Sequence, residues 1–343
     1  MSTQKIDISA QKSIKILLLI GGLFAIFYYG KTLIMPLLVG GIIAIILDIP
    51  VQKLKNLGLP NWLAITLSIL LMLIIFSLLF WLVSSQINNM AQDWPTIKDK
   101  ATVKLNALSQ WANNSLNWDY KDYIENNQKL VKKAEALASN FLSSLMSLLS
   151  QSLIIFIYII LFLMQKQQFI NFFKKLYPKN VSINSLLKNS ANITRSYFVG
   201  KGKIMLFLFV IYYLGFLLGS VPYALFLALF ASLFSIIPYV GNIIGGGVAV
   251  ILSFLYAGST PALIVIGVVS ATQLVENYLL TPWIIGDEIN LNPFMTIFGV
   301  ILFSTLWGVV GAIIALPVIG VLKVIFDHTN GMEAYAHLLK KTD

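Results

Sequence analysis

The feature that most constrains this chain is its nearly uncharged second half. Between Ile204 and Leu322 there is no Lys or Arg, and the acidic residues are Glu276, Asp287 and Glu288. Over the whole chain 11% of the residues are charged, whereas a soluble domain uses about 25% to keep its surface hydrated. This pattern predicts an all-α integral membrane protein.

Eight apolar runs divide the chain. They cover approximately residues 16–29, 33–50, 61–83, 141–164, 204–219, 222–257, 261–280 and 294–326. A helix needs about 20 apolar residues to cross the hydrocarbon, so the runs beginning at Asn61, Phe141 and Pro261 are long enough to cross. We expect a polytopic helical bundle of about six spanning helices, together with two re-entrant helical hairpins.

The net charge of +10 comes mostly from one segment, residues 165–203. Its charged residues are all basic: Lys166, Lys174, Lys175, Lys179, Lys188, Arg195, Lys201 and Lys203. Long apolar runs flank the segment, and a basic excess in a loop beside membrane helices marks the cytoplasmic side. The charge therefore indicates orientation rather than a nucleic-acid partner, and it is compatible with binding of anionic lipid head groups.

This orientation places both termini in the cytoplasm of a multi-pass protein of the bacterial cytoplasmic (inner) membrane. The first run follows basic residues, as a signal peptide would, but no small-residue cleavage pattern follows it, so we expect a retained helix. We divide the chain into N-terminal membrane helices (1–83), an extracytoplasmic amphipathic helical segment (84–140), a membrane helix (141–164), a basic cytoplasmic loop (165–203), a half with two broken hairpins (204–326) and a cytoplasmic tail (327–343).

Two of the apolar runs are interrupted in the middle. The run 222–257 breaks at the sequence IPYVGNIIGGG, and the run 294–326 breaks at LWGVVG. Each half of the first run is about 16 residues, or roughly 24 Å of helix, which is short for a crossing. Four short spanning helices and two re-entrant hairpins both fit. The absence of charge at either turn favours hairpins, whereas the turn between the first two runs carries Lys31.

Irregular backbone at membrane depth is tolerated only where protein or a water-filled cavity satisfies its polar groups, and in many transporters it binds ions or polar substrates. The breaks therefore supply candidate residues for a substrate or ion path: Pro238, Tyr239, Gly241, Asn242, Gly308 and Gly311. The alternative for Gly241 and Gly245 is a GxxxG contact, which lets two helices approach closely.

Glu276 is the sharpest single feature of the second half. On an ideal helix Gln273, Glu276 and Asn277 share one face, so all three are candidates for the same path. A charged side chain at a helix centre costs about 2.5 to 3.5 kcal/mol, so such residues usually face a cavity or a partner. Glu276 could instead be an ordinary boundary residue near the end of its helix.

No catalytic constellation is visible. The chain has no cysteine, and His328 and His337 do not share a helical face, so we expect no enzyme activity, no cofactor and no metal site. Gly200, Lys201, Gly202 and Lys203 lack the spacing of a phosphate loop. Asp48 is interpreted as a helix-end residue at the cytoplasmic interface.

Three motifs in order resemble the autoinducer-2 exporter family of bacterial membrane proteins. They are VPYALFLALFASLFSIIPYVGNIIGG, QLVENYLLTPWIIGDEINLNP and LWGVVGAIIALPV, and the resemblance extends from about Lys12 to Asp327. It implies a helical secondary transporter, assembled as a homo-oligomer such as a pentamer, with substrate engaged at two hairpins and moved by an elevator-type shift. The candidate residues above match the motifs of the family, as does Pro317. Ser304 and Thr305 stand where paired glycines are expected.

The resemblance leaves two transport activities open. The chain is expected to export a small polar metabolite such as autoinducer-2, a signal in quorum sensing. The alternative is a sodium (or lithium)/proton antiporter in which Glu276 carries the proton. A membrane scaffold without transport, built around residues 84–140, is a third hypothesis.

Overall fold

The computed structural model describes residues 10–93, a discontinuous set between 95 and 110, and residues 152–176, 183–237, 240–286 and 290–341. Within these ranges all regular structure is helical, apart from an isolated antiparallel bridge between Leu291 and Lys340. By length and composition, five of these helices could cross a membrane, or six if one bent pair counts as a span. The prediction of a polytopic helical bundle is confirmed. Most of the predicted segment 84–140 lies outside the described residues.

The first half forms a small bundle with its own core. It consists of α1 (Ala10–Tyr29), α2 (Lys31–Asn56), α3 (Asn61–Gln92) and the helix Ser152–Met164, which bends by 70° into α6 (Lys166–Leu176). The buried side chains between α2, α3 and Ser152–Met164 include Leu47, Val51, Ile65 and Ile159. Gly40 brings α2 close to Tyr158, because a Cβ there would lie 2.8 Å from the Tyr158 Cβ.

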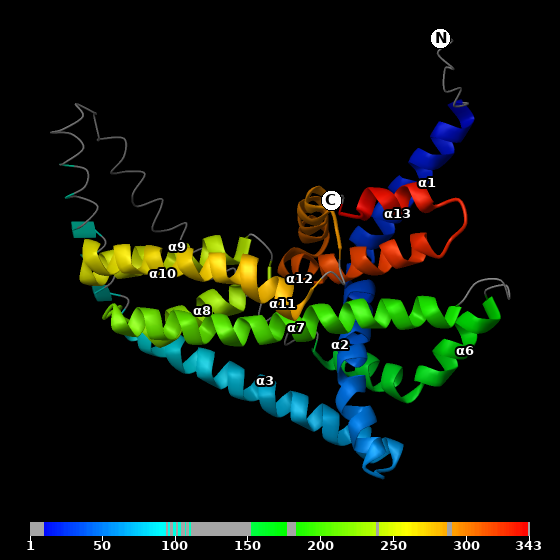
Figure 1. Ribbon diagram of the computed structural model, residues 1–343, viewed down its shortest axis with the longest axis horizontal. Helices are drawn as coiled ribbons and strands as arrows, with labels where there is room; N and C mark the ends of the chain where they lie inside the picture. The colour runs from blue at the N-terminus through cyan, green and yellow to red at the C-terminus, as the bar shows by residue number, and fades with distance from the viewer. Residues whose placement is uncertain are drawn as a thin grey trace.

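The second half packs around one long helix, α7. Its elements are α7 (Ile183–Leu218), α8 (Ala224–Phe234), α9 (Val240–Ala257), α10 (Ser259–Val275), the π-helix η1 (Glu276–Leu280), α11 (Thr281–Ile284), α12 (Pro293–Asp327) and α13 (Glu333–Leu339). Figure 1 shows α8 and α10 running alongside the green α7, which α2 crosses steeply, and α9 packs on α8 and α10. Ile204, Leu208, Tyr212 and Phe216 of α7 are fully buried in this second core.

The structure differs from the predicted basic loop 165–203. Of its described part, Lys166–Leu176 is α6, and α7 begins at Ile183, so that Arg195 and Lys201 lie on a helix. The reason is that apolar residues recur at helical spacing through the basic segment. Ile183, Leu186, Ile193 and Tyr197 are all buried, and this continuous apolar stripe extends the helix upstream of the uncharged run.

Both broken runs fold into helical hairpins. In the first hairpin, α9 packs on α8 so closely that a Cβ on Gly245 would lie 2.6 Å from the Ala231 Cα, which confirms the close GxxxG-type approach. In the second, α12 bends at Trp307 and Gly308, where Gly308 has a φ of 63°. Gly299 then lies against Ile319, although residues this far apart in a straight helix would be about 30 Å apart.

Candidate functional site

Glu276 lies where α10 changes into the π-helix η1. A local cause is Pro282, which has no N–H to donate to the preceding turn and therefore interrupts the α-helical hydrogen-bond ladder. Single π-helical turns inside α-helices occur frequently at functional sites. The Glu276 side chain points inward and is 5% exposed. The interpretation of Glu276 as a boundary residue is therefore wrong.

Lys201 of α7 is the partner of Glu276. Its Nζ donates a hydrogen bond of 2.6 Å to Glu276 Oε1, and its own side chain is 9% exposed. The two helices approach closely next to this pair, since a Cβ on Gly200 would lie 2.7 Å from Ile285 Cγ1. The sequence alone did not predict Lys201 as the partner of Glu276. The uncharged run from Ile204 to Leu322 contains no basic residue, and Lys201 lies just upstream of it.

Tyr197 links α7 to the first hairpin. It lies one helical turn before Lys201 and is 2% exposed. Its hydroxyl donates to the Ile236 carbonyl oxygen at 3.4 Å, two residues beyond the end of α8. The next predicted path residues, Pro238 and Tyr239, lie outside the described residues.

Gln273 and Asn277 are hydrogen-bonded to each other on the same stretch of helix. The Gln273 Nε2 donates to Asn277 Oδ1 at 3.0 Å, and Asn277 is exposed. Consecutive side chains of a helix point in different directions, so Asn277 is exposed although it directly follows the buried Glu276. Of the three residues on the predicted polar face, Glu276 is buried, Gln273 is half-buried and Asn277 is exposed.

The remaining candidates lie at the two hairpin breaks. Gly241 is in contact with the backbone of Phe234, and Gly311 with the backbone of Phe303. Asn242 belongs to α9. Beside Gly308, the Trp307 indole donates to the Phe27 carbonyl oxygen at 3.0 Å, which ties the second break to α1.

Two departures from the family motif have a local role. The hydroxyls of Ser304 and Thr305 both donate to the Ile301 carbonyl oxygen at 2.8 Å.

Pro317, which matches the family motif, is fully buried in the second arm of α12.

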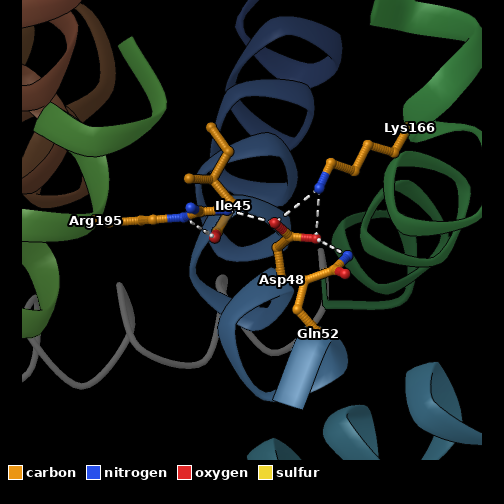
Figure 2. A network of polar contacts seen from close by, with 5 residues as sticks. All are labelled: Ile45, Asp48, Gln52, Lys166 and Arg195. Carbon is orange, nitrogen blue, oxygen red and sulfur yellow. Dashed lines mark hydrogen bonds and ion pairs between the residues drawn. The ribbon is translucent and has the colours of Figure 1, made fainter. Parts of the chain in front are cut away.

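A second buried carboxylate, Asp48, lies between the two halves of the protein. Figure 2 shows Lys166 of α6 and Arg195 of α7 approaching it from opposite sides. Lys166 Nζ lies 2.8 Å from both carboxylate oxygens, Gln52 Nε2 donates to Oδ1 at 3.1 Å, and Arg195 forms an ion pair with Oδ2. Arg195 Nε also donates to the Ile45 carbonyl oxygen at 3.1 Å.

This cluster corrects the interpretation of Asp48 as a helix-end residue. Asp48 is 5% exposed and lies inside α2, which continues to Asn56. The sequence feature that could have predicted this cluster is the single acidic residue in the apolar run 33–50. A charged side chain in such a run usually has a basic partner elsewhere in the protein. Arg195 and Lys201 are about 9 Å apart along α7, so one helix carries the partners of both buried carboxylates.

No group of three or more His, Asp or Glu residues that could hold a metal ion occurs in the part of the chain that the structure describes.

Comparison with known proteins identifies the family. The model of the AI-2E family of transporters matches residues 16–331. This chain belongs to the AI-2E transporter family. The matched region of this AI-2E family member contains both hairpins and both buried ion-pair clusters, and the resemblance inferred from the three motifs is confirmed.

Curated relatives of this AI-2E family member are named as transport proteins. The putative transport protein YueF of Bacillus subtilis is 31% identical over 315 residues, which cover 86% of this chain and 84% of that protein. The AI-2 transport protein TqsA of Escherichia coli is 22% identical, with 95% of each chain covered. The putative permease PerM of Escherichia coli is 24% identical, with 92% and 93% covered. These names indicate transport rather than enzyme activity.

Proposed function

We propose that this protein is a secondary transporter that exports a small polar metabolite, such as autoinducer-2, across the bacterial cytoplasmic membrane. The observation that carries the proposal is the buried Lys201–Glu276 pair at the start of a π-helix. Two opposite charges within apolar helices are expensive and usually mark a substrate or ion path. An ammonium donates and a carboxylate accepts hydrogen bonds, so together they suit a substrate rich in hydroxyl groups.

The dimensions of the first hairpin support a re-entrant path. Helix α8 has 11 residues, which correspond to about 16 Å, roughly half the thickness of the hydrocarbon. Its turn would then lie at membrane depth, where the backbone near Gly241 and Asn242 can contact a polar substrate. The bend at Gly308 and Gly311 would supply the second tip.

The arrangement of the buried clusters supports an elevator-type movement. Helices α7 to α12 share one buried cluster, whereas α2, α3 and Ser152–Met164 share another. A smaller cluster lies at the contact between these parts, where Met35 of α2 packs with Leu306 and Trp307 of α12. We assign the moving part to α7–α12 and the stationary part to the N-terminal bundle, with both termini in the cytoplasm. Exposed apolar residues of α3, such as Leu71, Ile74 and Trp81, are available to lipid or to neighbouring copies in a homo-oligomer, which we expect to be a pentamer.

The test is transport by the purified full-length protein in vesicles, with autoinducer-2 and monovalent cations as alternative substrates. Glu276→Gln keeps the shape of the side chain and removes its charge, so we expect autoinducer-2 transport to fall to background. Tyr278→Phe, at an exposed position of the same π-helix, serves as the control and is expected to retain transport. Unchanged transport by Glu276→Gln would remove this pair from the path.

A sodium (or lithium)/proton antiporter is the second candidate. The ion pair favours it in one respect: Lys201 Nζ contacts one carboxylate oxygen, and a proton or a small cation could replace it there. Sodium-driven proton flux that is lost in Glu276→Gln, without any autoinducer-2 transport by the parent protein, would select this activity. The scaffold hypothesis predicts that deletion of residues 95–135 abolishes function, whereas a transporter should retain its flux.

A further inference from the structure

Helix α6 combines a membrane-proximal position with an unusual surface. It follows the apolar helix Ser152–Met164 after a bend of 70°, so it runs across the direction of that helix. Phe169, Phe172 and Leu176 are spaced three and four residues apart and are exposed. They form one apolar stripe, while Asn171 and Lys174 lie on other faces of the helix.

Two contacts prevent α6 from turning this stripe inward. At its first residue, Lys166 binds both oxygens of the buried Asp48. One turn before its end, Phe173 packs against a buried cluster that includes Leu186 of α7 and Val324 of α12. These contacts fix the rotation of α6, and in this orientation the apolar stripe remains exposed.

The basic residues around the apolar stripe indicate which kind of surface can bind there. Lys174 and Lys175 are exposed, and the sequence from 165 to 203 contains no acidic residue. A helix with an apolar stripe and a basic polar face lies in the interface of a membrane, with its apolar side chains at the boundary between head groups and acyl chains. Lysines next to that boundary attract anionic head groups.

We propose that α6 is an interfacial helix that docks on the anionic lipid surface through Phe169, Phe172 and Leu176, with Lys174 and Lys175 attracting the anionic head groups. Because Lys166 also binds Asp48, and Asp48 binds Arg195, the docked helix is linked to the helix that carries Lys201. The inference does not depend on the substrate of the transporter.

The chain has no native cysteine, so single nitroxide labels can be placed cleanly. We would label Phe172→Cys and, as the control on the polar face, Asn171→Cys in the full-length protein. Each would be reconstituted in phosphatidylcholine vesicles with and without phosphatidylglycerol. Collision rates with oxygen, which enriches in acyl chains, and with a water-soluble nickel chelate report on the depth of the label.

In anionic vesicles we expect the label at 172 to collide mainly with oxygen and the label at 171 mainly with the chelate. Lys174→Gln combined with Lys175→Gln should weaken docking by about 25-fold, since each lysine contributes on the order of fivefold, and the label at 172 should become accessible to the chelate. Equal chelate access at 171 and 172 would overturn the proposal. Identical lipid contact in both vesicle types would also overturn it. So would a label at 172 that neither oxygen nor the chelate reaches, together with disulfide cross-linking between copies of Phe172→Cys, because the stripe would then contact a neighbouring protomer.

Discussion

Lys201 Nζ and Glu276 Oε1 lie 2.6 Å apart, although the two residues are separated by 75 positions in the sequence. Both side chains are buried, and each is the ion-pair partner of the other. The pair fixes the contact between α7 and the π-helix beside the first hairpin. Its energetic role can be separated from its transport role, because stability and flux are measured independently.

Lys201→Met is expected to destabilise the protein by about 3 to 5 kcal/mol, because it leaves an uncompensated buried carboxylate. Adding Glu276→Gln should recover most of the loss, since no charge then remains unpaired. Thermal unfolding of the purified protein in one detergent is the measurement. Lys203→Met, an exposed lysine on the same helix, is the matched control. If the double variant were as unstable as Lys201→Met, the pair would not be the cause.

Asp48→Asn removes the common partner of Lys166 and Arg195. The Lys166 and Arg195 side chains are 45% and 31% exposed, so solvent screens part of the loss, and we expect a cost of about 2 kcal/mol. Because α6 loses the anchor at its first residue, trypsin should cleave faster after Lys174 and Lys175. Asp327→Asn, at an exposed position, should leave both the melting temperature and the cleavage rate unchanged.

Two glycines of α9 should respond to alanine in opposite directions. Gly241 is in contact with the Phe234 backbone, so Gly241→Ala must displace one arm of the hairpin, at a cost of about 1 to 3 kcal/mol. No atom outside the local helix backbone and the two neighbouring residues lies within 4 Å of a Cβ added at Gly247, so Gly247→Ala should stabilise its helix by about 0.5 to 1 kcal/mol. Melting temperatures that moved the same way for both variants would contradict the packed hairpin.

Trp307→Phe tests the link between α1 and the bend of α12. The substitution removes the indole hydrogen bond to the Phe27 carbonyl oxygen and part of a buried ring, so we expect a loss of about 1 to 2 kcal/mol in thermal unfolding. Trp283 is 77% exposed, which makes Trp283→Phe the corresponding control with little expected change. A larger effect at Trp283 would argue against the described anchoring of the bend.

Several elements follow from local sequence patterns. The apolar runs 33–50 and 261–280 become α2 and α10 with η1, because burial of apolar side chains and satisfaction of backbone hydrogen bonds both require helix in a membrane. The clusters of proline and glycine around Gly241 and Gly308 mark the two breaks, because these residues interrupt or redirect a helix. The start of α7 was misplaced because the basic residues of 165–203 obscured the apolar stripe of Ile183, Leu186 and Ile193.

The sequence by itself determined the membrane class, the helical segments, the positions of the breaks and the family. The tertiary structure decided which charges meet. Lys201 reaches Glu276, and Asp48 reaches both Lys166, 118 positions away, and Arg195, 147 positions away. Helical periodicity relates residues within a few turns of one another, whereas these pairings depend on how α2, α6, α7 and α10 pack. The same packing decided that Glu276 is buried against Lys201 while the adjacent Asn277 is exposed.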